Sequence, residues 1–362
     1  MLERKNTFFN KAICFICIIF TLSFASNASV GNCEDTISMI KNYECRYSVE
    51  CTTAGGNKKL IAGGMPFGIK LFCDGVLISG VSEVDGIDGN TNPGMKAGLK
   101  AGDIIKKING KDIFGISNVL ESAYNSEGKT VRFTVMRGNK LFETDITPIK
   151  SKSNDNYSYG LWVKDGTSGI GTITYIDPQS LEFGGLGHGV CDSSSGKVLP
   201  MNNGKVNDVK ISDVEKSKKG DPGELHGFLS GNDIGVIISN TEFGVFGVYN
   251  DIDISSCKAY TVGNKDELKE GPATILCTLS ENNICEYEIK IEKINNNNEK
   301  TKNFIVKVTD KELLSETGGI VQGMSGSPII QNGRLVGAVT HVLVDDPTRG
   351  YGIYIENMLN AS

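Results

Sequence analysis

Short apolar runs separated by glycine, asparagine and aspartate fill the second half of the chain. Segments such as GIGTITYID, DIGVIIS, ATILCTL and CEYEIKIEKI alternate apolar and polar residues, or cluster apolar ones, over the length of a strand. That pattern is typical of β-strands joined by tight turns. Residues 151–362 are therefore predicted to form an all-β barrel or sandwich.

The preceding stretch, residues 62–150, mixes strands with short helices. Its helical segment has apolar residues spaced by three and four, and its strands alternate apolar and polar positions. The expected elements are strands at about 67–73 and 76–83 around a Cys73-Asp74-Gly75 turn, a short helix, an Asn109-Gly110 turn, a helix near 116–124 and a hairpin over 131–146.

The first 28 residues have the pattern of an export signal. Basic residues precede the uncharged apolar run AICFICIIFTLSFA, and small residues follow it. This run is shorter than the roughly 20 apolar residues of a spanning helix, which favours a cleaved signal peptide. The uncharged stretch continues to Val30, so an uncleaved signal-anchor is the alternative. Residues 29–61 are predicted to be an extension and linker, and the remaining chain is expected to be exported.

Composition narrows the function classes. The 362 residues include 44 Gly and 9 Pro, which suits many tight turns. The net charge of −6 and the scattered Lys and Arg argue against a nucleic-acid-binding face. The chain has only 3 His, and no CxxC pair lies beyond the apolar segment, so no metal site is expected. Cysteines beyond that segment permit disulfides in an exported chain, with Cys277 and Cys285 as candidate diagonal neighbours on one hairpin face. Free thiols fit the sequence equally well.

An ordered series of motifs in residues 62–150 resembles a PDZ domain. The motifs are Pro93-Gly94, Ala97-Gly98-Leu99, Ala101-Gly102-Asp103-Ile104-Ile105, Ile108-Asn109-Gly110 and the closing hairpin. The resemblance implies that an extended peptide adds to a sheet edge, with its terminal carboxylate held by backbone N–H groups of a nearby loop. That loop is expected to consist of Met65, Pro66, Phe67, Gly68 and Ile69. The alternative is that the module is a rigid spacer.

The string Gly323-Met324-Ser325-Gly326-Ser327-Pro328 is a candidate nucleophile turn. A serine hydroxyl needs a base to remove its proton and donors to stabilise an oxyanion. Flanking glycines would let the N–H groups of Gly323 and Ser325 converge on one point, as in the oxyanion hole of trypsin-like enzymes. A strand, an NG turn and a second strand follow, whereas the G-x-S-x-G elbow of α/β-hydrolases requires a helix. A turn serine without catalytic function is the alternative.

The base must be one of three histidines. His188 lies between glycines in GGLGHGVCD, where the end of a short strand can present it to a cleft. His226, in GELHGFL, is the weaker candidate for the base. His341 is expected either to line the substrate pocket or to have a structural role. His188 precedes Ser325, as in the His…Asp…Ser order of trypsin-like enzymes.

Two longer stretches around these residues resemble the stage IV sporulation protein B family. They are IGTITYIDPQSLEFGGLGHGVCDSSSGKVLP and TGGIVQGMSGSPIIQNGRLVGAVTHVLVDDPTRGYGIYIENML. The resemblance implies a mainly β chain in which a small PDZ domain is followed by a trypsin-like double β-barrel serine peptidase domain. It also implies a sporulation signalling endopeptidase that is exported from the forespore into the space between the two forespore membranes.

The same resemblance implies partners and a catalytic set. Family members process themselves and then cleave a membrane-bound regulatory protein, which relieves inhibition of an intramembrane protease that matures a sigma factor. The PDZ domain would hold a protein C-terminus or the enzyme's own N-terminal segment, and only that segment would contact the membrane. His188 matches the family's general base, Ser325 its nucleophile and Asp310 its acidic member.

The acidic member has two candidates. Asp310, in KVTDKELL, matches the family position and is favoured, but it lies far from His188 along the chain. Asp233, in GNDIG, has the shorter spacing from His188 that trypsin-like enzymes show. A catalytic acid must be buried and must accept a hydrogen bond from the histidine.

Two other functions are weighed against this one. The first is a catalytically inactive PDZ adaptor, which the intact Gly-His-Gly and Gly-Met-Ser-Gly-Ser-Pro strings disfavour. The second is a periplasmic-type quality-control protease, but in those proteins the peptidase domain precedes the PDZ domain. Serine acyl transfer needs no cofactor, and none is expected.

Overall fold

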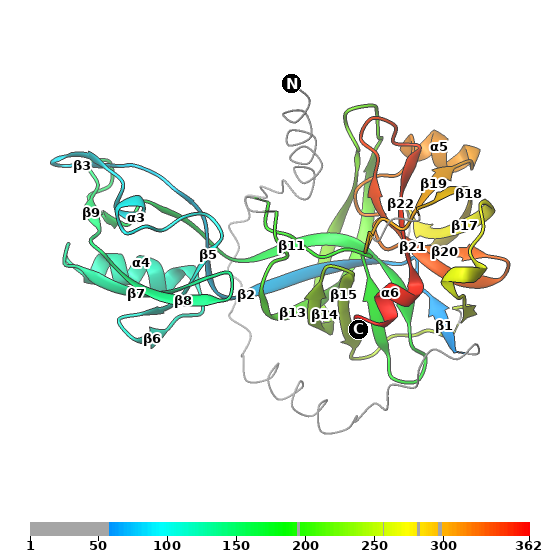
Figure 1. Ribbon diagram of the computed structural model, residues 1–362, viewed down its shortest axis with the longest axis horizontal. Coiled ribbons are helices and arrows are strands. Elements are labelled where there is room, and N and C mark those ends of the chain that lie inside the picture. Colours follow the sequence, from blue (N-terminus) through cyan, green and yellow to red (C-terminus); the bar gives the residue numbers. More distant parts are fainter. Residues whose placement is uncertain (1–57, 194–195, 256, 281–282, 296–298) are drawn as a thin grey trace.

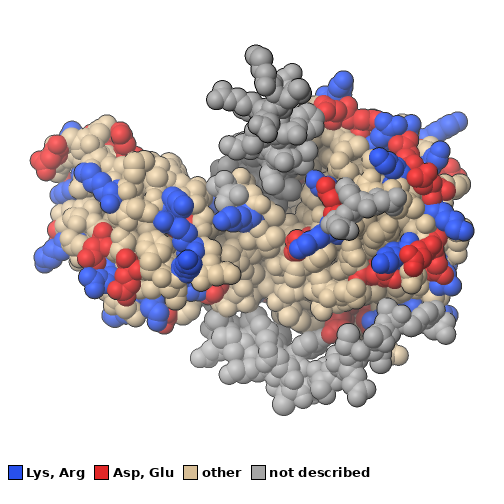
Figure 2. Space-filling view, viewed as in Figure 1, with Lys and Arg blue, Asp and Glu red and all other residues tan. Residues whose placement is uncertain are grey.

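The computed structural model describes residues 58–193, 196–255, 257–280, 283–295 and 299–362 (Figure 1). The predicted export signal and residues 29–57 lie outside the described residues. The described chain is mainly β, as predicted, and forms a smaller and a larger body joined by two long strands. On the face shown in Figure 2, acidic and basic side chains are interspersed over both bodies.

The larger body contains two closed barrels. In the first, each strand pairs antiparallel with the next and the last pairs with the first. Its strands are, in pairing order, β2 (Pro66–Val81), β11 (Leu161–Ile176), β12 (Glu182–Gly185), β15 (Gly244–Tyr249), β14 (Glu224–Thr241) and β13 (Met201–Glu215). Side chains that alternate along these strands, such as Phe67, Ile173 and Phe183, fill the interior.

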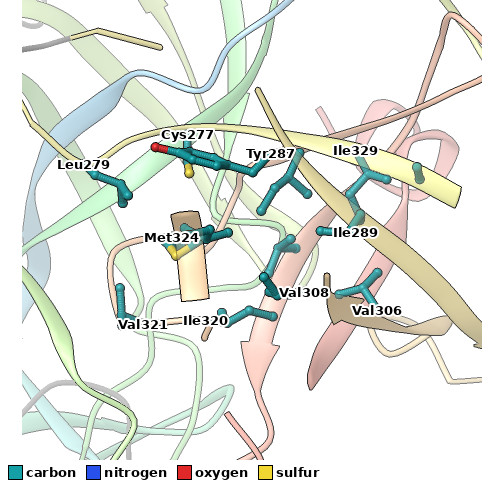
Figure 3. Close-up of a cluster of buried hydrophobic side chains, with 14 of the residues drawn as sticks. Cys277, Leu279, Tyr287, Ile289, Val306, Val308, Ile320, Val321, Met324 and Ile329 are labelled. Atoms are coloured by element: carbon teal, nitrogen blue, oxygen red, sulfur yellow. The ribbon is translucent and has the colours of Figure 1, made fainter. Parts of the chain in front are cut away.

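The second barrel closes in the same way, through six antiparallel pairings. Its strands are, in pairing order, β17 (Gly271–Thr278), β18 (Ile284–Ile294), β19 (Phe304–Val308), β22 (Arg349–Tyr354), β21 (Arg334–Val342) and β20 (Pro328–Gln331). Figure 3 shows its core, where Met324 packs against Val321 and Tyr287 among other buried side chains. Two such barrels make the trypsin-like architecture that the sequence predicted.

A short strand joins the two barrels. β1 (Lys59–Ala62) pairs with β11 of the first barrel and with β16 (Ala259–Val262), which in turn pairs with β21 of the second barrel. Short helices complete the larger body: η1 (Lys265–Glu267), α5 (Lys311–Thr317) and α6 (Ile355–Leu359).

The smaller body corresponds to the predicted PDZ domain. Its core packs α4 and the surrounding strands around Phe133 and Tyr159, whose rings meet edge to face. The elements are β3 (Val84–Gly86), β4 (Gly89–Thr91), α3 (Pro93–Lys96), β5 (Asp103–Ile108), β6 (Lys111–Asp112), α4 (Ile116–Asn125), β7 (Val131–Arg137), β8 (Lys140–Ile146), β9 (Ile149–Lys150) and β10 (Tyr157–Ser158). The predicted helix, hairpin and Asn109-Gly110 turn are confirmed, the turn by φ angles of 49° and 77°.

The two bodies share strands, so they do not follow one another simply along the chain. β2 and β11 each run from the first barrel into the PDZ domain, and they pair with each other in both. Along the chain, the PDZ elements therefore lie between two strands that belong to the first barrel. The sequence predicted a peptidase domain beginning at residue 151, but Lys59–Ala62 and the first half of β2 already pair inside the barrels.

The predicted Cys73-Asp74-Gly75 turn is wrong, because β2 continues through it as one strand. At this point the pairing with β11 shifts register, which marks a bulge rather than a reversal. Gly75 has a φ of 106°, and a Cβ there would lie 2.5 Å from the carbonyl oxygen of Ile105. The glycine is thus required where the strand passes from barrel to PDZ domain.

Candidate functional site

The turn that carries Ser325 is fixed by backbone contacts with β11. The Thr172 N–H donates to the Ser325 carbonyl at 3.0 Å, and the Thr172 hydroxyl donates to the Gly323 carbonyl at 2.8 Å. The Thr174 hydroxyl donates to the Gly326 carbonyl at 2.8 Å. One strand therefore holds three residues of the turn, and Met324 is fully buried in the core of the second barrel.

Both flanking glycines are required by this geometry. Gly323 and Gly326 have φ angles of 97° and 98°, which residues with a Cβ rarely adopt. A Cβ on Gly326 would lie 1.9 Å from the carbonyl oxygen of Thr172. The sequence interpretation of these glycines as backbone determinants is supported by the fold.

The backbone N–H groups of Gly323 and Ser325 are available to bind an anion. Neither the Gly323 N–H nor the Ser325 N–H donates a hydrogen bond within the described part of the chain. By contrast, the intervening Met324 N–H donates to Val321, and the Gly326 N–H donates to Val339. The two uncommitted amides are the ones predicted to stabilise an oxyanion.

His188 reaches the same place from the first barrel. It follows β12 in a loop where Leu186 and Gly187 both have φ angles of 67°. Its Nδ1 lies 3.0 Å from the Gly189 carbonyl oxygen, which favours the tautomer with the hydrogen on Nδ1. Burial lowers the pKa of His188, and the bond to Gly189 only partly offsets this. The ring is thus neutral at neutral pH, with a lone pair on Nε2 for proton abstraction.

A single pocket brings these residues together. Its walls come from β2, β11, the His188 loop, the start of β14 and the Ser325 turn. It is lined by Ile69, Thr167, Ser168, Gly169, Ile170, Leu186, His188, Gly189, Val190, Cys191, Glu224, Leu225, Gln322, Gly323 and Ser325. Residues far apart in the sequence thus share one cavity between the two barrels, as the trypsin-like interpretation requires. The Ser325 hydroxyl itself donates to the Thr340 carbonyl at 2.6 Å.

The two candidate acids are engaged elsewhere. Asp310 is the N-cap of α5: one of its oxygens accepts from Glu312 and Leu313, and the other accepts from Glu288. Burial raises the pKa of Asp310, but these three backbone donors outweigh it and lower the pKa below its ordinary value. Among the hydrogen bonds of the described residues, none joins Asp310 to His188.

Asp233 is likewise committed. It accepts from the Lys205 ammonium and from the side-chain amide of Asn207, across the β13–β14 pairing. The shorter spacing from His188 along the chain therefore does not translate into a contact with the imidazole in the described structure.

The remaining histidines differ sharply from each other. His226 pairs with Glu215 near the exposed end of the β13–β14 hairpin, 3.6 Å between Nε2 and Oε2. His341, on β21, stacks on His188. From the sequence alone, His341 was expected either to line the pocket or to have a purely structural role. The only sequence feature that pointed to a place for His341 in the pocket was its position after the hairpin that follows Ser325.

The predicted PDZ peptide loop is wrong. Phe67 is fully buried and Ile69 nearly so. Residues 66–69 pair with β11, and residues 68–69 also pair with β13. These residues lie in the first barrel, not in the PDZ domain. A glycine-flanked apolar segment suits a buried strand as well as a peptide loop, because both need glycine for close approach: a Cβ on Gly63 would lie 2.2 Å from the Ile173 carbonyl.

The open edge of the PDZ domain lies on β11 instead. Residues 161–164 pair with β2 on one side, and no other strand of the described chain pairs with them. α4 lies beside this segment, because the Ile116 N–H donates to Asp165 and Ser122 is 3.0 Å from the Tyr159 hydroxyl. Gly160, just before it, has a φ of 65°. A strand edge next to a helix is the arrangement to which peptides add in PDZ domains.

No group of His, Cys, Asp and Glu among the described residues could hold a metal ion. Within the described ranges, no helix is long and apolar enough to cross a membrane. Cys277 and Cys285 lie directly opposite each other on β17 and β18, rather than diagonally.

Comparison with known proteins identifies both bodies. The family model described as SpoIVB peptidase S55 matches residues 155–359, and the model described as PDZ domain matches residues 92–137. The first of these matches spans more than half of the chain.

Curated relatives match over shorter stretches. A probable periplasmic serine endoprotease DegP-like of Brucella suis is 34% identical over 107 residues, covering 24% of this chain and 21% of that protein. A putative zinc metalloprotease, LL2128, of Lactococcus lactis is 30% identical over 124 residues, covering 34% and 28%. The matched stretch thus spans less than a third of either relative.

Solved structures resemble the chain only distantly. The active form of the Rv3671c protease of M. tuberculosis covers 68% of this chain and 86% of its own, at 14% identity and a TM-score of 0.31. The HtrA-type protease AlgW with decapeptide covers 55% and 53%, at 12% identity and a TM-score of 0.32.

Proposed function

We propose that this chain, which belongs to the SpoIVB peptidase S55 family of serine peptidases, is an exported signalling endopeptidase of sporulation. It would process itself and then cleave a membrane-bound regulatory protein, and so trigger activation of a pro-sigma factor by an intramembrane protease. The export signal in residues 1–28 and the family membership support the location between the forespore membranes. The PDZ domain supports a protein substrate.

One observation carries the catalytic part of the proposal. His188 with a free Nε2, Ser325, and the uncommitted amides of Gly323 and Ser325 line one pocket although they come from different barrels. These are the base, nucleophile and oxyanion donors that acyl transfer requires. A chance grouping of a turn serine with a core histidine would not leave two amides of the same turn without partners.

The reaction follows from these groups. Nε2 of His188 removes the Ser325 proton as Oγ attacks the scissile carbonyl carbon, and the Gly323 and Ser325 amides bind the resulting oxyanion. The histidine then gives that proton to the leaving amine, and the peptide C–N bond breaks. Water, deprotonated by the same Nε2, attacks the acyl-enzyme and releases the carboxylate product with Ser325 restored.

The described arrangement is a resting one. The Ser325 hydroxyl donates to the Thr340 carbonyl, so Oγ must rotate toward His188 before it can be deprotonated. Catalytic hydrogen bonds often form only in the complex with substrate. The role of Asp310 as the third member stays a prediction: the Gly189 carbonyl now accepts from Nδ1, and the Asp310 cap would have to open to replace it.

The proposed partner of the PDZ domain is a peptide C-terminus laid along residues 161–164 of β11. Its carboxylate would meet the backbone near Tyr159 and Gly160, and its side chains would face α4. The same strand continues to Thr172, which holds the Ser325 turn. A bound protein is thereby held near the cavity that would cut it.

The test is the size of the purified exported chain on incubation, beside Ser325→Ala. Shortening of the wild type but not of the variant, with wild-type labelling by a serine-reactive phosphonate, supports the peptidase. Co-incubation of a tagged Ser325→Ala chain with the wild type shows whether cleavage also occurs between molecules. If the two proteins behave identically and neither is labelled, the peptidase proposal fails and the inactive PDZ adaptor takes its place.

A further inference from the structure

Glu224 stands at the wall of the catalytic pocket. It is the first residue of β14 and lines the cavity together with His188 and Ser325. Its position is fixed by two backbone bonds to the Ser325 turn: Leu225 N–H donates to the Gln322 carbonyl at 2.9 Å, and Gln322 N–H donates to the Gly223 carbonyl at 3.1 Å. Gln322 immediately precedes the oxyanion donor Gly323, so Glu224 is tied to the reaction centre.

Glu224 is also the single carboxylate in that wall. The other lining residues are apolar, small or neutral polar side chains, and His188 is neutral because burial lowers its pKa. Neither Lys nor Arg lines the pocket. When ionised, Glu224 gives the cavity that also contains His188 and Ser325 a negative charge.

The charge of Glu224 is only partly compensated by its surroundings. Among the ion pairs of the described residues, none involves Glu224, whereas Glu215, directly opposite on β13, pairs with His226. Glu224 is half-buried, and burial raises its pKa, which reflects the cost of holding the charge there. The charge of His226 partly offsets this rise in the pKa, and the charge of Glu215 adds to it. A half-buried charge that is only partly compensated is stabilised by a cation brought from outside.

We infer that Glu224 is a specificity-determining residue, which selects a Lys or Arg side chain of the substrate beside the scissile bond. This inference rests on the proposed peptidase function. An ammonium or guanidinium entering the pocket would form a charge-assisted hydrogen bond with Glu224, while an acidic side chain would be repelled. A neutral polar side chain would gain a hydrogen bond but little Coulomb attraction.

The experiment uses the full chain and internally quenched peptides that place Lys, Arg, Gln, Leu or Glu at each position from P3 to P3′. We expect a preference for Lys and Arg over Gln at one position, by about tenfold in kcat/KM. Glu224→Gln should abolish that preference, and Glu224→Lys should shift it toward Glu. Glu215→Gln is the matched control, because it neutralises the neighbouring carboxylate outside the pocket and should leave the preference unchanged.

The outcomes distinguish a failure of the Glu224 assignment from a failure of the proposed peptidase function. If the wild type cleaves peptides and labels with phosphonate at Ser325, but prefers no basic residue, the assignment of Glu224 is overturned while the peptidase stands. The same holds if a basic preference survives in Glu224→Gln. If neither cleavage nor labelling occurs, the proposed function itself fails. Unaltered phosphonate labelling of Glu224→Gln excludes misfolding as the cause of its altered preference.

Discussion

The imidazole rings of His188 and His341 lie stacked, with their centroids 4.5 Å apart and 34° between their planes. His341 follows Thr340, whose carbonyl accepts the Ser325 hydroxyl, so the residue touches the proposed base and adjoins the resting place of the proposed nucleophile. Its Nδ1 is buried and has no partner among the described residues. Burial, followed by the charge of His188, lowers the pKa of His341.

The stack predicts that His341 positions the base by packing. His341→Ala should lower kcat by about tenfold or more, because a free ring face lets His188 leave its productive orientation. His341→Phe keeps a flat ring at that place and should retain most of the activity. Steady-state cleavage of a quenched peptide by both variants checks this. Equal losses in the two variants would show that the His341 nitrogens, rather than the ring, are needed.

The pH dependence of catalysis follows from the His188 environment. Because burial lowers the pKa of His188 below the ordinary 6.5, the base form should persist into mildly acidic solution. The acid limb of kcat/KM should therefore have its midpoint below 6.5. A profile from pH 4 to 9 measures it, and a midpoint at or above 6.5 would contradict the buried, neutral base.

Stability should depend on the same two rings. In the unfolded chain His188 and His341 bind protons near 6.5, while in the folded chain burial keeps them neutral to lower pH. The unfolded state thus binds more protons between the two values, so the free energy of unfolding should fall as pH drops from about 6.5. Urea unfolding of wild type and His341→Phe at pH 7 and pH 5 tests this, with a smaller fall expected for the variant.

The turn geometry predicts a severe effect at Gly326. Gly326→Ala must move the chain away from Thr172, because its Cβ would lie 1.9 Å from that carbonyl oxygen. We expect loss of phosphonate labelling at Ser325 together with reduced stability. Gly333→Ala is the matched control: its φ of 73° is also left-handed, but a Cβ there meets nothing within 4 Å. It should cost about 1 kcal/mol of backbone strain and leave labelling intact.

Asp310 should stabilise α5 whatever else it does. Asp310→Ala removes an N-cap and should lower the free energy of unfolding by about 1 kcal/mol, while Asp310→Asn keeps a capping oxygen and should restore most of it. Activity of the equally stable Asn variant then reports on the predicted catalytic role. A loss of about 10⁴-fold in kcat would mark a triad acid. Asp233→Asn, measured alongside, tests the competing candidate.

Trp162 gives a direct probe of the PDZ edge. It is the one tryptophan of the chain, it lies within residues 161–164, and it is 65% exposed. Peptides with a free C-terminal carboxylate should change its fluorescence saturably, and the same peptides amidated at the C-terminus should bind much more weakly. Indifference to both forms would argue that the module is a spacer.

Local chemistry was readable from the sequence. Asn332 and Gly333 have φ angles of 52° and 73°, as the NG turn after Ser325 predicts. The helical spacing of Ile116, Val119, Leu120 and Tyr124 predicted α4, but it did not fix the buried face, because Val119 is buried whereas Leu120 and Tyr124 are exposed. The Ser325 turn and His188 were chosen as candidates for the same reason: glycine neighbours signal backbone geometry that residues with a Cβ avoid. Such signals act within a few residues, so one sequence suffices to detect them.

Strand partners and contacts between barrels were decided only by the tertiary structure. Residues 66–69 read equally well as a peptide loop or a core strand, and pairing with β11 and β13 settled the matter. Four other features also became visible only in the tertiary structure. They are the insertion of the PDZ domain within β2 and β11, the capping role of Asp310, the stack of His341 on His188 and the place of Glu224 in the pocket. Each depends on which distant segments pack together. The alternation of apolar residues along a strand determines which face is buried, but it does not determine which strand pairs with it.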